Sequence, residues 1–396
     1  MAWTATPAIH PRLPAMGLRV AVVGARRVRN GTGPYLAREA SALGAEVVSV
    51  VGTRPSSTET ACTQLKEWGI SAKPFTHFDP MVRETHPDVL IVASPAGTHR
   101  SWLEAAAESG MHVLCEKPLL ALFDDAGKEM LRRFSAQGKV LAENCQWPFT
   151  LFSFQQLHPS FDPSKVKRFR MLLSPQDRGR TRWLETLSHP LSLLQDVFHG
   201  PAKISEIRYE EVSSSAPDAR LNFLFTVFDQ EIHCEVLLED TNRLPRPAEF
   251  AFDDMVCRRR IEIPGYHFSF DTGFQPIELG DGPALSVKAE DPLHLRMTEF
   301  MIRVSQAVKT GNAPLDESLL RRQQLMEKLL AAYRPRFAHL QDPLHSRKDS
   351  RLYGKTSPAS LARCGFGLCA MASGLRRCRK GEDSKARIPI SWACIH

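Results

Sequence analysis

The sequence predicts an α/β protein, in which an N-terminal doubly wound parallel sheet is followed by an α+β domain with an open, mainly antiparallel sheet. Three observations predict this class. Up to about residue 148, short apolar runs alternate with helical stretches, as in a parallel sheet covered on both faces. Beyond that point, runs alternate apolar and polar residues, which is typical of strands with one wet face. Two amphipathic stretches, 292–310 and 315–333, then predict helices.

The first part of the chain reads as strands and helices in strict alternation. Residues 18–23 form a continuous β-branched run, which is typical of a buried parallel strand. The helix after it begins near Pro34, a residue suited to a first turn, and ends at Gly44. The further expected strands are 45–52, 74–77, 88–94, 112–117 and 139–143, and the further expected helices are 56–68, 79–86, 99–110 and 123–137.

The second part begins with four strands of the alternating kind. They are expected at 166–173, 203–212, 220–228 and 231–239, with a hairpin turn at 228–231. The domain division predicted from these patterns is a flexible N-terminus (1–16), a nucleotide-binding domain (17–148), a substrate-binding and oligomerisation domain (149–338) and a basic tail (339–396). The tail is expected to be disordered, because it has no sustained period and is rich in Ser, Arg and Gly.

The charge is concentrated in this tail. Residues 346–396 hold eleven lysines and arginines against three carboxylates, which accounts for the net charge of +7. The rest of the chain is close to neutral, so no nucleic-acid partner is expected for it. Nucleic-acid binding would rest on the tail alone.

The cysteines and the N-terminus argue against a metal site and against export. Cys364, Cys369, Cys378 and Cys394 lack paired CxxC spacing, so no metal is expected. The N-terminus has no long apolar core, and no stretch approaches 18 apolar residues. We therefore expect a cytoplasmic protein without a membrane partner.

The loop between the first strand and the first helix lies where dinucleotide-binding sheets recognise phosphate. Arginines stand at the second and fifth positions after its first glycine, where the usual fingerprint has glycines. On the spacing alone, a phosphate loop and a structural turn fit equally well. The arginines, Arg29 included, suit bidentate phosphate contacts and favour the first interpretation. The candidate phosphate-binding residues are Gly24, Arg26, Arg27, Gly31, Thr32 and Gly33.

The end of the second strand bears on the choice of nicotinamide cofactor. A carboxylate there would bind the adenosine ribose and repel a 2′-phosphate. This chain has Thr53 and Arg54 instead, followed by two serines. Arg54 is able to pair with a 2′-phosphate, so NADP(H) is preferred over NAD(H). The alternative is an exposed arginine in a polar loop.

Residues 92–119 strongly resemble the glucose–fructose oxidoreductase / inositol dehydrogenase (Gfo/Idh/MocA) family. The matching features are Ser94 and Pro95 after a strand, His99 at the start of a helix, Gly110, and the run 112–118 (HVLCEKP). The resemblance extends over roughly residues 18–335. It implies a nucleotide-binding Rossmann domain and a second domain whose sheet faces the substrate and commonly supports oligomers. We accordingly expect a homo-oligomer, a dimer or tetramer, acting on a small-molecule substrate.

Glu116 and Lys117 end a parallel strand, so their side chains are expected at the crevice where such sheets bind ligands. The resemblance implies that Glu116 contacts the nicotinamide ribose and that Lys117 reaches the reacting oxygen. It also places Ser94, Pro95 and His99 with the cofactor-binding residues. A surface lysine at a strand end is the alternative.

The second matching stretch is 183–200. Glu185 and His189 are four residues apart, so on one helix they would share a face. The resemblance makes His189 the candidate general acid/base, with Glu185 orienting its ring or sharing its proton; alone, such a pair is usually solvated. The family usually has aspartate at the position of Glu185.

Other features around the second stretch concern the substrate pocket. The flanking arginines 178, 180 and 182 line a pocket for an anionic substrate or lie on a solvated loop, and the loop is preferred. Gln146 and Trp147 stand where the family often has an arginine, and are expected to form a neutral pocket wall.

The predicted function is an NADP(H)-preferring oxidoreductase. It would transfer a hydride between the nicotinamide and a secondary alcohol or ketone of a sugar, cyclitol or related polar metabolite, with Lys117, His189 and Glu185 as catalytic residues. The alternative is a sensor of the same fold, which binds the dinucleotide without turnover. The presence of Lys117 and His189 argues against it, because a sensor needs no proton-transfer pair.

Overall fold

The computed structural model describes residues 17–26, 31–211, 218–241, 243–262, 267–272 and 285–334. The predictions made for Arg27 and Arg29, for the N-terminus 1–16 and for the tail 339–396 lie outside the described residues. Across the described ranges, no helix is long and apolar enough to cross a membrane.

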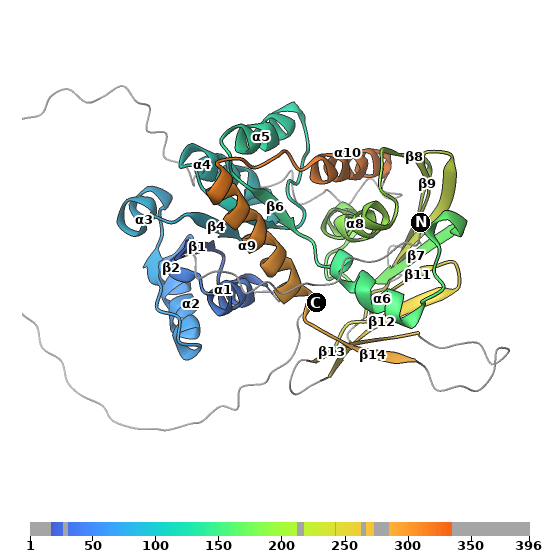
Figure 1. The fold of residues 1–396 in the computed structure, drawn as a ribbon, viewed down its shortest axis with the longest axis horizontal. Helices are drawn as coiled ribbons and strands as arrows, with labels where there is room; N and C mark the ends of the chain where they lie inside the picture. The colour runs from blue at the N-terminus through green and yellow to red at the C-terminus, as the bar shows by residue number, and fades with distance from the viewer. Residues whose placement is uncertain are drawn as a thin grey trace, which may run out of the picture. The chain divides into compact units, whose positions relative to one another are not determined.

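The first part of the chain forms a six-stranded parallel sheet in the order β3-β2-β1-β4-β5-β6 (Figure 1). This is the predicted doubly wound topology, and each expected strand is present. The chain reverses direction across the sheet between β1 and β4, where such folds bind ligands. The strands are β1 Arg19–Val23, β2 Glu46–Val51, β3 Lys73–Phe75, β4 Val89–Val92, β5 His112–Glu116 and β6 Leu141–Asn144.

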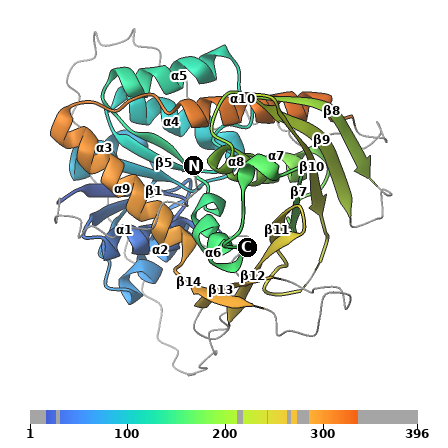
Figure 2. The same ribbon diagram turned by 45° about the vertical axis from the view of Figure 1, so that its right-hand side comes forward.

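Helices cover both faces of this sheet. Each connection between strands carries one helix, as right-handed crossovers require. The helices are α1 Gly33–Ala42, α2 Pro55–Glu67, α3 Phe78–Thr85, α4 His99–Glu108 (after the short 3₁₀ turn η1 Ala96–Thr98) and α5 Asp125–Ala136. A later helix, α9 (Pro292–Thr310), returns to this sheet and packs beside α1, as Figures 1 and 2 both show. Its apolar side chains Met297, Phe300 and Val304 are buried in the same core cluster as Val20 and Leu36.

The second part of the chain forms an eight-stranded sheet in the order β14-β13-β12-β11-β7-β10-β9-β8. Every neighbouring pair is antiparallel except β7 and β10, so the expected mainly antiparallel sheet is confirmed. The expected hairpin is present too, because Val227 pairs with Gln230 across a two-residue turn. The strands are β7 Arg168–Leu173, β8 Ala202–Glu211, β9 Ala219–Val227, β10 Gln230–Leu238, β11 Glu249–Phe252, β12 Met255–Glu262, β13 His267–Asp271 and β14 Ser286–Ala289.

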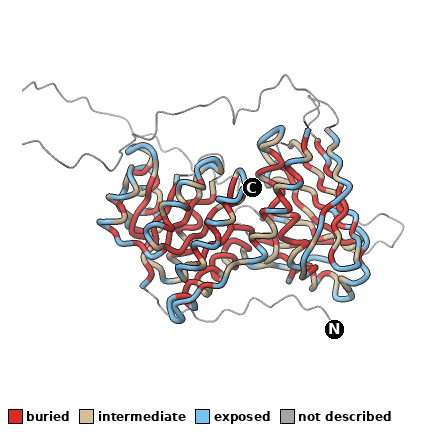
Figure 3. The backbone as a smooth tube through the Cα atoms, turned by 90° about the horizontal axis from the view of Figure 1, so that it is seen from above, coloured by how far each residue is buried: buried red, intermediate tan, exposed pale blue. Residues whose placement is uncertain are grey.

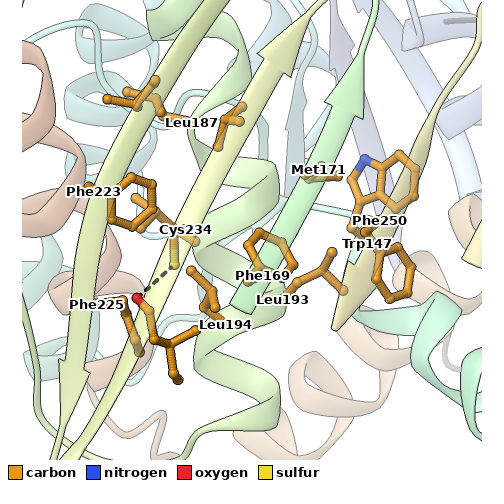
Figure 4. Packing of buried hydrophobic residues seen from close by; sticks show 14 of the residues in the cluster. Trp147, Phe169, Met171, Leu187, Leu193, Leu194, Phe223, Phe225, Cys234 and Phe250 are labelled. Carbon is orange, nitrogen blue, oxygen red and sulfur yellow. Dashed lines mark hydrogen bonds between the residues drawn. The ribbon is translucent and has the colours of Figure 1, made fainter. Parts of the chain in front are cut away.

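Helices pack on one face of the second sheet, where alternate strand residues point inward. In Figure 4, Phe169, Phe223 and Phe250 project from their strands against Leu193 and Leu194 of α8. Figure 3 colours the chain by burial, with the buried residues in red. The remaining helical segments are α6 Leu151–Leu157, α7 Gly179–Thr186, α8 Ser188–Val197 and α10 Glu317–Ala332, with the 3₁₀ turns η2 Trp147–Thr150 and η3 Pro163–Lys165.

The stretch 183–200 is not one helix, as the Glu185–His189 spacing argument assumed. It is divided at Leu187 between α7 and α8. Pro190 supplies the physical reason, because proline has no N–H to donate to the carbonyl of Thr186. The chain nevertheless stays in the right-handed helical region at Leu187, whose N–H donates to the Trp183 carbonyl at 3.0 Å.

The buried His112 at the start of β5 makes a pH-dependent contribution to stability. Its Nδ1 accepts a hydrogen bond from the Val140 N–H at 3.0 Å. Burial, with a smaller contribution from Lys139, lowers the pKa of His112 from 6.5 to about 4. Below pH 6.5 the unfolded chain therefore binds a proton that the folded chain does not, so stability falls as the pH falls.

We expect the free energy of unfolding to decrease by about 1.4 kcal/mol per pH unit from this group between pH 6.5 and about 4. His112→Asn keeps an acceptor for the Val140 N–H. It should remove the contribution of one proton from the slope of the free energy of unfolding against pH. Urea titrations at a series of pH values measure this. His77→Asn, at an exposed position, is the control; an equal effect from both would contradict the assignment.

Candidate active site

Two glycines of the loop after β1, Gly24 and Gly33, lie so close to neighbouring backbone atoms that no side chain would fit. Gly24 has a φ of +80°, and a Cβ there would lie 2.5 Å from the carbonyl oxygen of Ala93. A Cβ on Gly33 would lie 2.4 Å from the carbonyl oxygen of Gly24. Gly24 thus makes the tight turn, and Gly33 lets α1 approach the strand end, as the first and third glycines of a dinucleotide fingerprint do. The loop between them is longer than in that fingerprint, which is why its glycine spacing did not match.

Glu116 is held in place at the end of β5 by three donors. Asn144 Nδ2, at the end of β6, donates to its Oε1 at 2.6 Å, and the hydroxyl of Thr32 donates to the same oxygen. The backbone N–H of Lys117 donates to Oε2 at 3.2 Å. Thr32 precedes α1 and makes no side-chain cap on it. The phosphate loop and the carboxylate assigned to the ribose are therefore joined directly.

Lys117 reaches across to the second part of the chain. Its Nζ donates to the backbone carbonyl oxygen of Glu185 at 3.0 Å and lies 3.5 Å from Glu185 Oε2. Both side chains are partly buried, with 18% of Lys117 and 26% of Glu185 exposed. The structure thus pairs Glu185 with Lys117, whereas the support of His189 by Glu185 stays a prediction from the sequence.

The environment of Glu185 favours its protonated form. Burial raises the pKa of the Glu185 carboxyl, and the nearby Lys117 ammonium opposes this effect. The carboxyl therefore takes up a proton more readily than an exposed glutamate does.

His189 follows Glu185 at the start of α8 and is half-buried. Its Nδ1 lies 3.8 Å from Cys145 Sγ, and the edge of its ring faces Trp147 with the ring centroids 6.3 Å apart. Cys145 also contacts Ser192 Oγ at 3.0 Å. Burial raises the pKa of the Cys145 thiol to about 11, so it stays protonated near His189. His189 and Lys117 are thus both adjacent to the junction of α7 and α8.

Trp147 differs from the open pocket wall that the sequence suggested. Only 6% of it is exposed, and its ring packs against Phe250 as well as His189. Pro148 and the 3₁₀ turn η2 direct the indole into the core of the second part. The guanidinium of Arg259 lies over the same ring at 5.8 Å. Trp147 therefore packs against His189 inside the protein, and its ring offers little surface to a substrate pocket.

His99 is buried beneath the strand ends, with 1% of it exposed. Its Nδ1 lies 2.8 Å from the carbonyl oxygen of Pro118, and its Nε2 lies 2.8 Å from that of Ser94. Both ring nitrogens are therefore engaged with the backbone. His99 links the loop at Ser94 and Pro95 to the residue after Lys117, which is joined to Lys117 by a cis peptide bond.

The cationic residues assigned to the adenosine end lie near one another. Arg26 is exposed, and its guanidinium lies 3.5 Å from the hydroxyl of Ser57 in the first turn of α2. Arg54 is exposed at the N-cap of the same helix, directly after Thr53. Two loops thus bring an arginine each to the end of β2.

The arginines before Glu185 have different environments. Arg178 is exposed and forms an ion pair with Asp240, in agreement with the preferred solvated loop. Arg182 is buried, with 6% exposed, and donates to the carbonyl of Asp177 at 3.0 Å. The solvated-loop interpretation is therefore wrong for Arg182, because α7 begins at Gly179 and turns this side chain into the protein.

Sequence reasoning missed Asn144 and Cys145, although both follow directly from the strand that it identified. Asn144 is 2% exposed, and its Oδ1 is a buried atom with no hydrogen-bond partner within the described ranges. An acceptor left without a partner beside Glu116 is suited to a ligand that donates a hydrogen bond. Together with the glycine contacts at the loop, this arrangement fits a dinucleotide.

Comparison with known proteins agrees with this arrangement. Residues 18–145 match a family described as oxidoreductases with an NAD-binding Rossmann fold. An inositol 2-dehydrogenase from Salmonella typhimurium is 21% identical over 303 residues, covering 68% of this chain and 88% of that protein. A 1,5-anhydro-D-fructose reductase from Ensifer adhaerens is 37% identical over 103 residues, or 26% of this chain. The chain spans between 23% and 36% of the length of the first four curated relatives that it matches.

Solved structures share the fold over most of the chain. A 3-ketoreductase from Actinomadura kijaniata, determined with TDP-benzene and NADP, matches with a TM-score of 0.57 at 18% identity, covering 80% of this chain and 98% of that one. A protein from gentamicin A biosynthesis in complex with NAD matches with a TM-score of 0.58 at 15% identity, covering 84% and 98%. At these identities the likeness shows the fold alone.

Proposed function

We propose that the chain is an NAD(P)-dependent dehydrogenase or reductase of the Gfo/Idh/MocA family, whose NAD-binding Rossmann fold matches residues 18–145. Its substrate class is a secondary alcohol or ketone of a sugar, cyclitol or related polar metabolite. Named relatives act in this chemistry, among them a D-glucoside 3-dehydrogenase from Escherichia coli K12 that is 30% identical over 134 residues, covering 34% of this chain and 36% of that protein.

The residues around the loop after β1 are the ones that would hold the dinucleotide. Gly24 and Gly33 bring the end of β1 and the start of α1 close together, and with Gly31 they would let the pyrophosphate approach the backbone there. Glu116, fixed by Thr32 and Asn144, accepts from the nicotinamide ribose. Ser94 and Pro95 line the neighbouring strand end. His99 acts through the backbone that it holds and is a positioning residue.

Lys117 and His189 carry the proton chemistry. A dinucleotide held by these residues would supply the acceptor for the hydride that leaves the substrate carbon. As the alcohol becomes a carbonyl, His189 takes the hydroxyl proton and the Lys117 ammonium holds the oxygen by a hydrogen bond. Glu185 holds Lys117 through its carbonyl oxygen and pairs with the ammonium charge. In the reductive direction the same groups return the proton.

The observation that carries the proposal is the contact of Lys117 with Glu185, which lies four residues before His189. It brings a strand-end lysine beside Glu116 together with a carboxyl and an imidazole from the second part of the chain. The test is a panel of sugars and polyols with NADP⁺ and NAD⁺, and of their ketones with the reduced forms, followed by nicotinamide absorbance. Binding of a dinucleotide without turnover of any member would favour the sensor of the same fold.

The preference for NADP(H) over NAD(H) rests on Arg54 and Arg26. No carboxylate stands at the end of β2, and the two guanidiniums lie beside α2 where a 2′-phosphate would be placed. Homo-oligomerisation and the division into domains at residue 149 stay predictions from the sequence.

Replacing Arg54 should separate the two cofactors. A charge-assisted hydrogen bond is worth about 1.5–3 kcal/mol, so Arg54→Ala should raise the Kd for NADPH about tenfold to a hundredfold. The Kd for NADH should stay unchanged, because NADH has no 2′-phosphate. Fluorescence titration measures both constants. Arg83→Ala, at an exposed position in α3, is the matched control, and equal weakening of both cofactors by Arg54→Ala would contradict the assignment.

A further inference from the structure

Glu143 is a buried carboxylate at the end of β6 that accepts four hydrogen bonds. Its Oε1 accepts from the Leu119 N–H at 2.9 Å, from Ser188 Oγ at 3.0 Å and from Gln323 Nε2 at 3.2 Å. Its Oε2 accepts from Arg322 at 2.9 Å. No part of the Glu143 side chain is exposed. Every donor lies at least 24 residues away along the chain.

Two of these donors belong to the segments that carry the catalytic residues. Leu119 is two residues after Lys117, with Pro118 between them. Ser188 directly precedes His189 at the start of α8. A single carboxylate oxygen therefore binds the Lys117 segment and the His189 segment at once.

The neighbours of Glu143 extend the same link. Asn144 donates to Glu116, which precedes Lys117, and Cys145 contacts both the Ser188 carbonyl oxygen at 3.4 Å and His189 Nδ1 at 3.8 Å. The end of β6 thus contacts the side chains of Glu116 and His189 directly, and the Lys117 segment through the backbone of Leu119. The backbone carbonyl of Glu143 itself accepts two hydrogen bonds from Arg296, at 3.0 and 2.8 Å.

We propose that Glu143 is a positioning residue, which fixes Lys117 and His189 relative to each other through Leu119 and Ser188. The inference rests on the proposed function, because it assigns Glu143 to the same reaction. Lys117 and His189 must act on one substrate oxygen, and a displacement of about 1 Å between reacting groups costs on the order of a hundredfold in rate. The Glu143 carboxylate is able to hold the two residues in register, because its Oε1 accepts hydrogen bonds from both Leu119 and Ser188.

A purely structural role would make Glu143 the partner of the buried cation Arg322 and nothing more. The geometry argues otherwise, because only Oε2 faces Arg322, whereas Oε1 faces the two catalytic segments. The two roles differ in their consequences. Loss of an ion-pair partner lowers stability, and loss of a positioning contact lowers kcat without weakening dinucleotide binding.

The test uses two variants of the full chain and one control. Glu143→Gln removes the charge, and Ser188→Ala removes one hydroxyl and leaves the Arg322 ion pair intact. Ser49→Ala is the matched control: its hydroxyl is equally buried, accepts from Thr85 at 3.3 Å and lies in β2. Measured are kcat, KM, the Kd for NADPH, and the rates at which diethylpyrocarbonate modifies His189 and reductive methylation modifies Lys117, read by peptide mass spectrometry.

We expect Glu143→Gln to lower kcat by about a hundredfold and Ser188→Ala by about tenfold, with the Kd for NADPH close to that of the unmodified sequence. Modification of His189 should become severalfold faster in both variants and stay unchanged in Ser49→Ala. Where Glu143→Gln does not fold, Ser188→Ala alone decides.

The inference is overturned if both segments are modified at the original rates in Ser188→Ala, or if its kcat falls no further than that of Ser49→Ala. Failure of the proposed function has a different signature. The unmodified chain would then turn over no member of the panel, and the modification rates, which need no turnover, would still decide whether Glu143 positions Lys117 and His189.

Discussion

Replacement of Lys117 by methionine is expected to lower kcat by about a hundredfold to ten-thousandfold, with NADPH bound no more weakly than before. In the proposed mechanism the ammonium group is the donor that holds the substrate oxygen, and methionine keeps the length of the side chain without any donor. The residues proposed to hold the nicotinamide ribose are Glu116 and its partners Thr32 and Asn144, which the substitution leaves in place. Steady-state kinetics and a fluorescence titration measure the two quantities.

Two controls separate catalysis from folding in this experiment. Lys117→Arg retains a cation for Glu185 but places a planar guanidinium where a compact ammonium is needed, so kcat should still fall strongly. Lys128→Met removes a lysine on α5 that forms an ion pair with the exposed Asp125, and should leave kcat unchanged. Turnover by Lys117→Met at the original rate would remove Lys117 from the mechanism.

Replacement of His189 by glutamine is the second large effect. Glutamine keeps a polar side chain of similar reach but cannot take up a proton, so kcat should fall by about a hundredfold to ten-thousandfold. The pH dependence of kcat provides the more specific readout. In the oxidative direction kcat should rise with pH as the base loses its proton. This rise should be absent from the plot of kcat against pH for the variant, because glutamine does not titrate.

The control for His189 is His233→Gln on the outer side of the second sheet, where the imidazole is exposed. It should change neither kcat nor the pH profile. A His189→Gln variant that keeps the original pH profile at a lower rate would assign the titration to another group, and Glu185, whose pKa is raised by burial, would then be the base.

The fold could be predicted from the sequence because the strands of the first sheet are buried on both faces. Residues 20–23 and 89–93 are apolar throughout, and the glycines and prolines between such runs mark the turns. The strands β11 to β14 were not predicted, because they are short or lack a regular pattern of apolar residues. β11 spans only Glu249–Phe252, and β12 (Met255–Glu262) carries three consecutive arginines, so neither shows a clear alternation.

The residues of the candidate site could be predicted where they are neighbours in the sequence. Glu116 and Lys117 adjoin in the sequence, and so their common position at a strand end followed directly. The pairing of Lys117 with Glu185 spans 68 residues and depends on how the second part packs. The contacts of Glu143 with Ser188 and Arg322 span 45 and 179 residues, and no local pattern encodes them. The break at Leu187 was foreseeable, because Pro190 cannot continue the hydrogen-bond ladder of α7.

The central claim is that this chain transfers hydride and does not only bind the dinucleotide. Its most direct test is to incubate the protein in stoichiometric amount with NADPH deuterated at the transferable C4 position and a panel of ketosugars and ketocyclitols, and to analyse the products by mass spectrometry. The account predicts deuterium on the new secondary alcohol carbon with the unmodified chain, and far less in the same time with Lys117→Met. Tight binding of NADPH without deuterium in any product would contradict it.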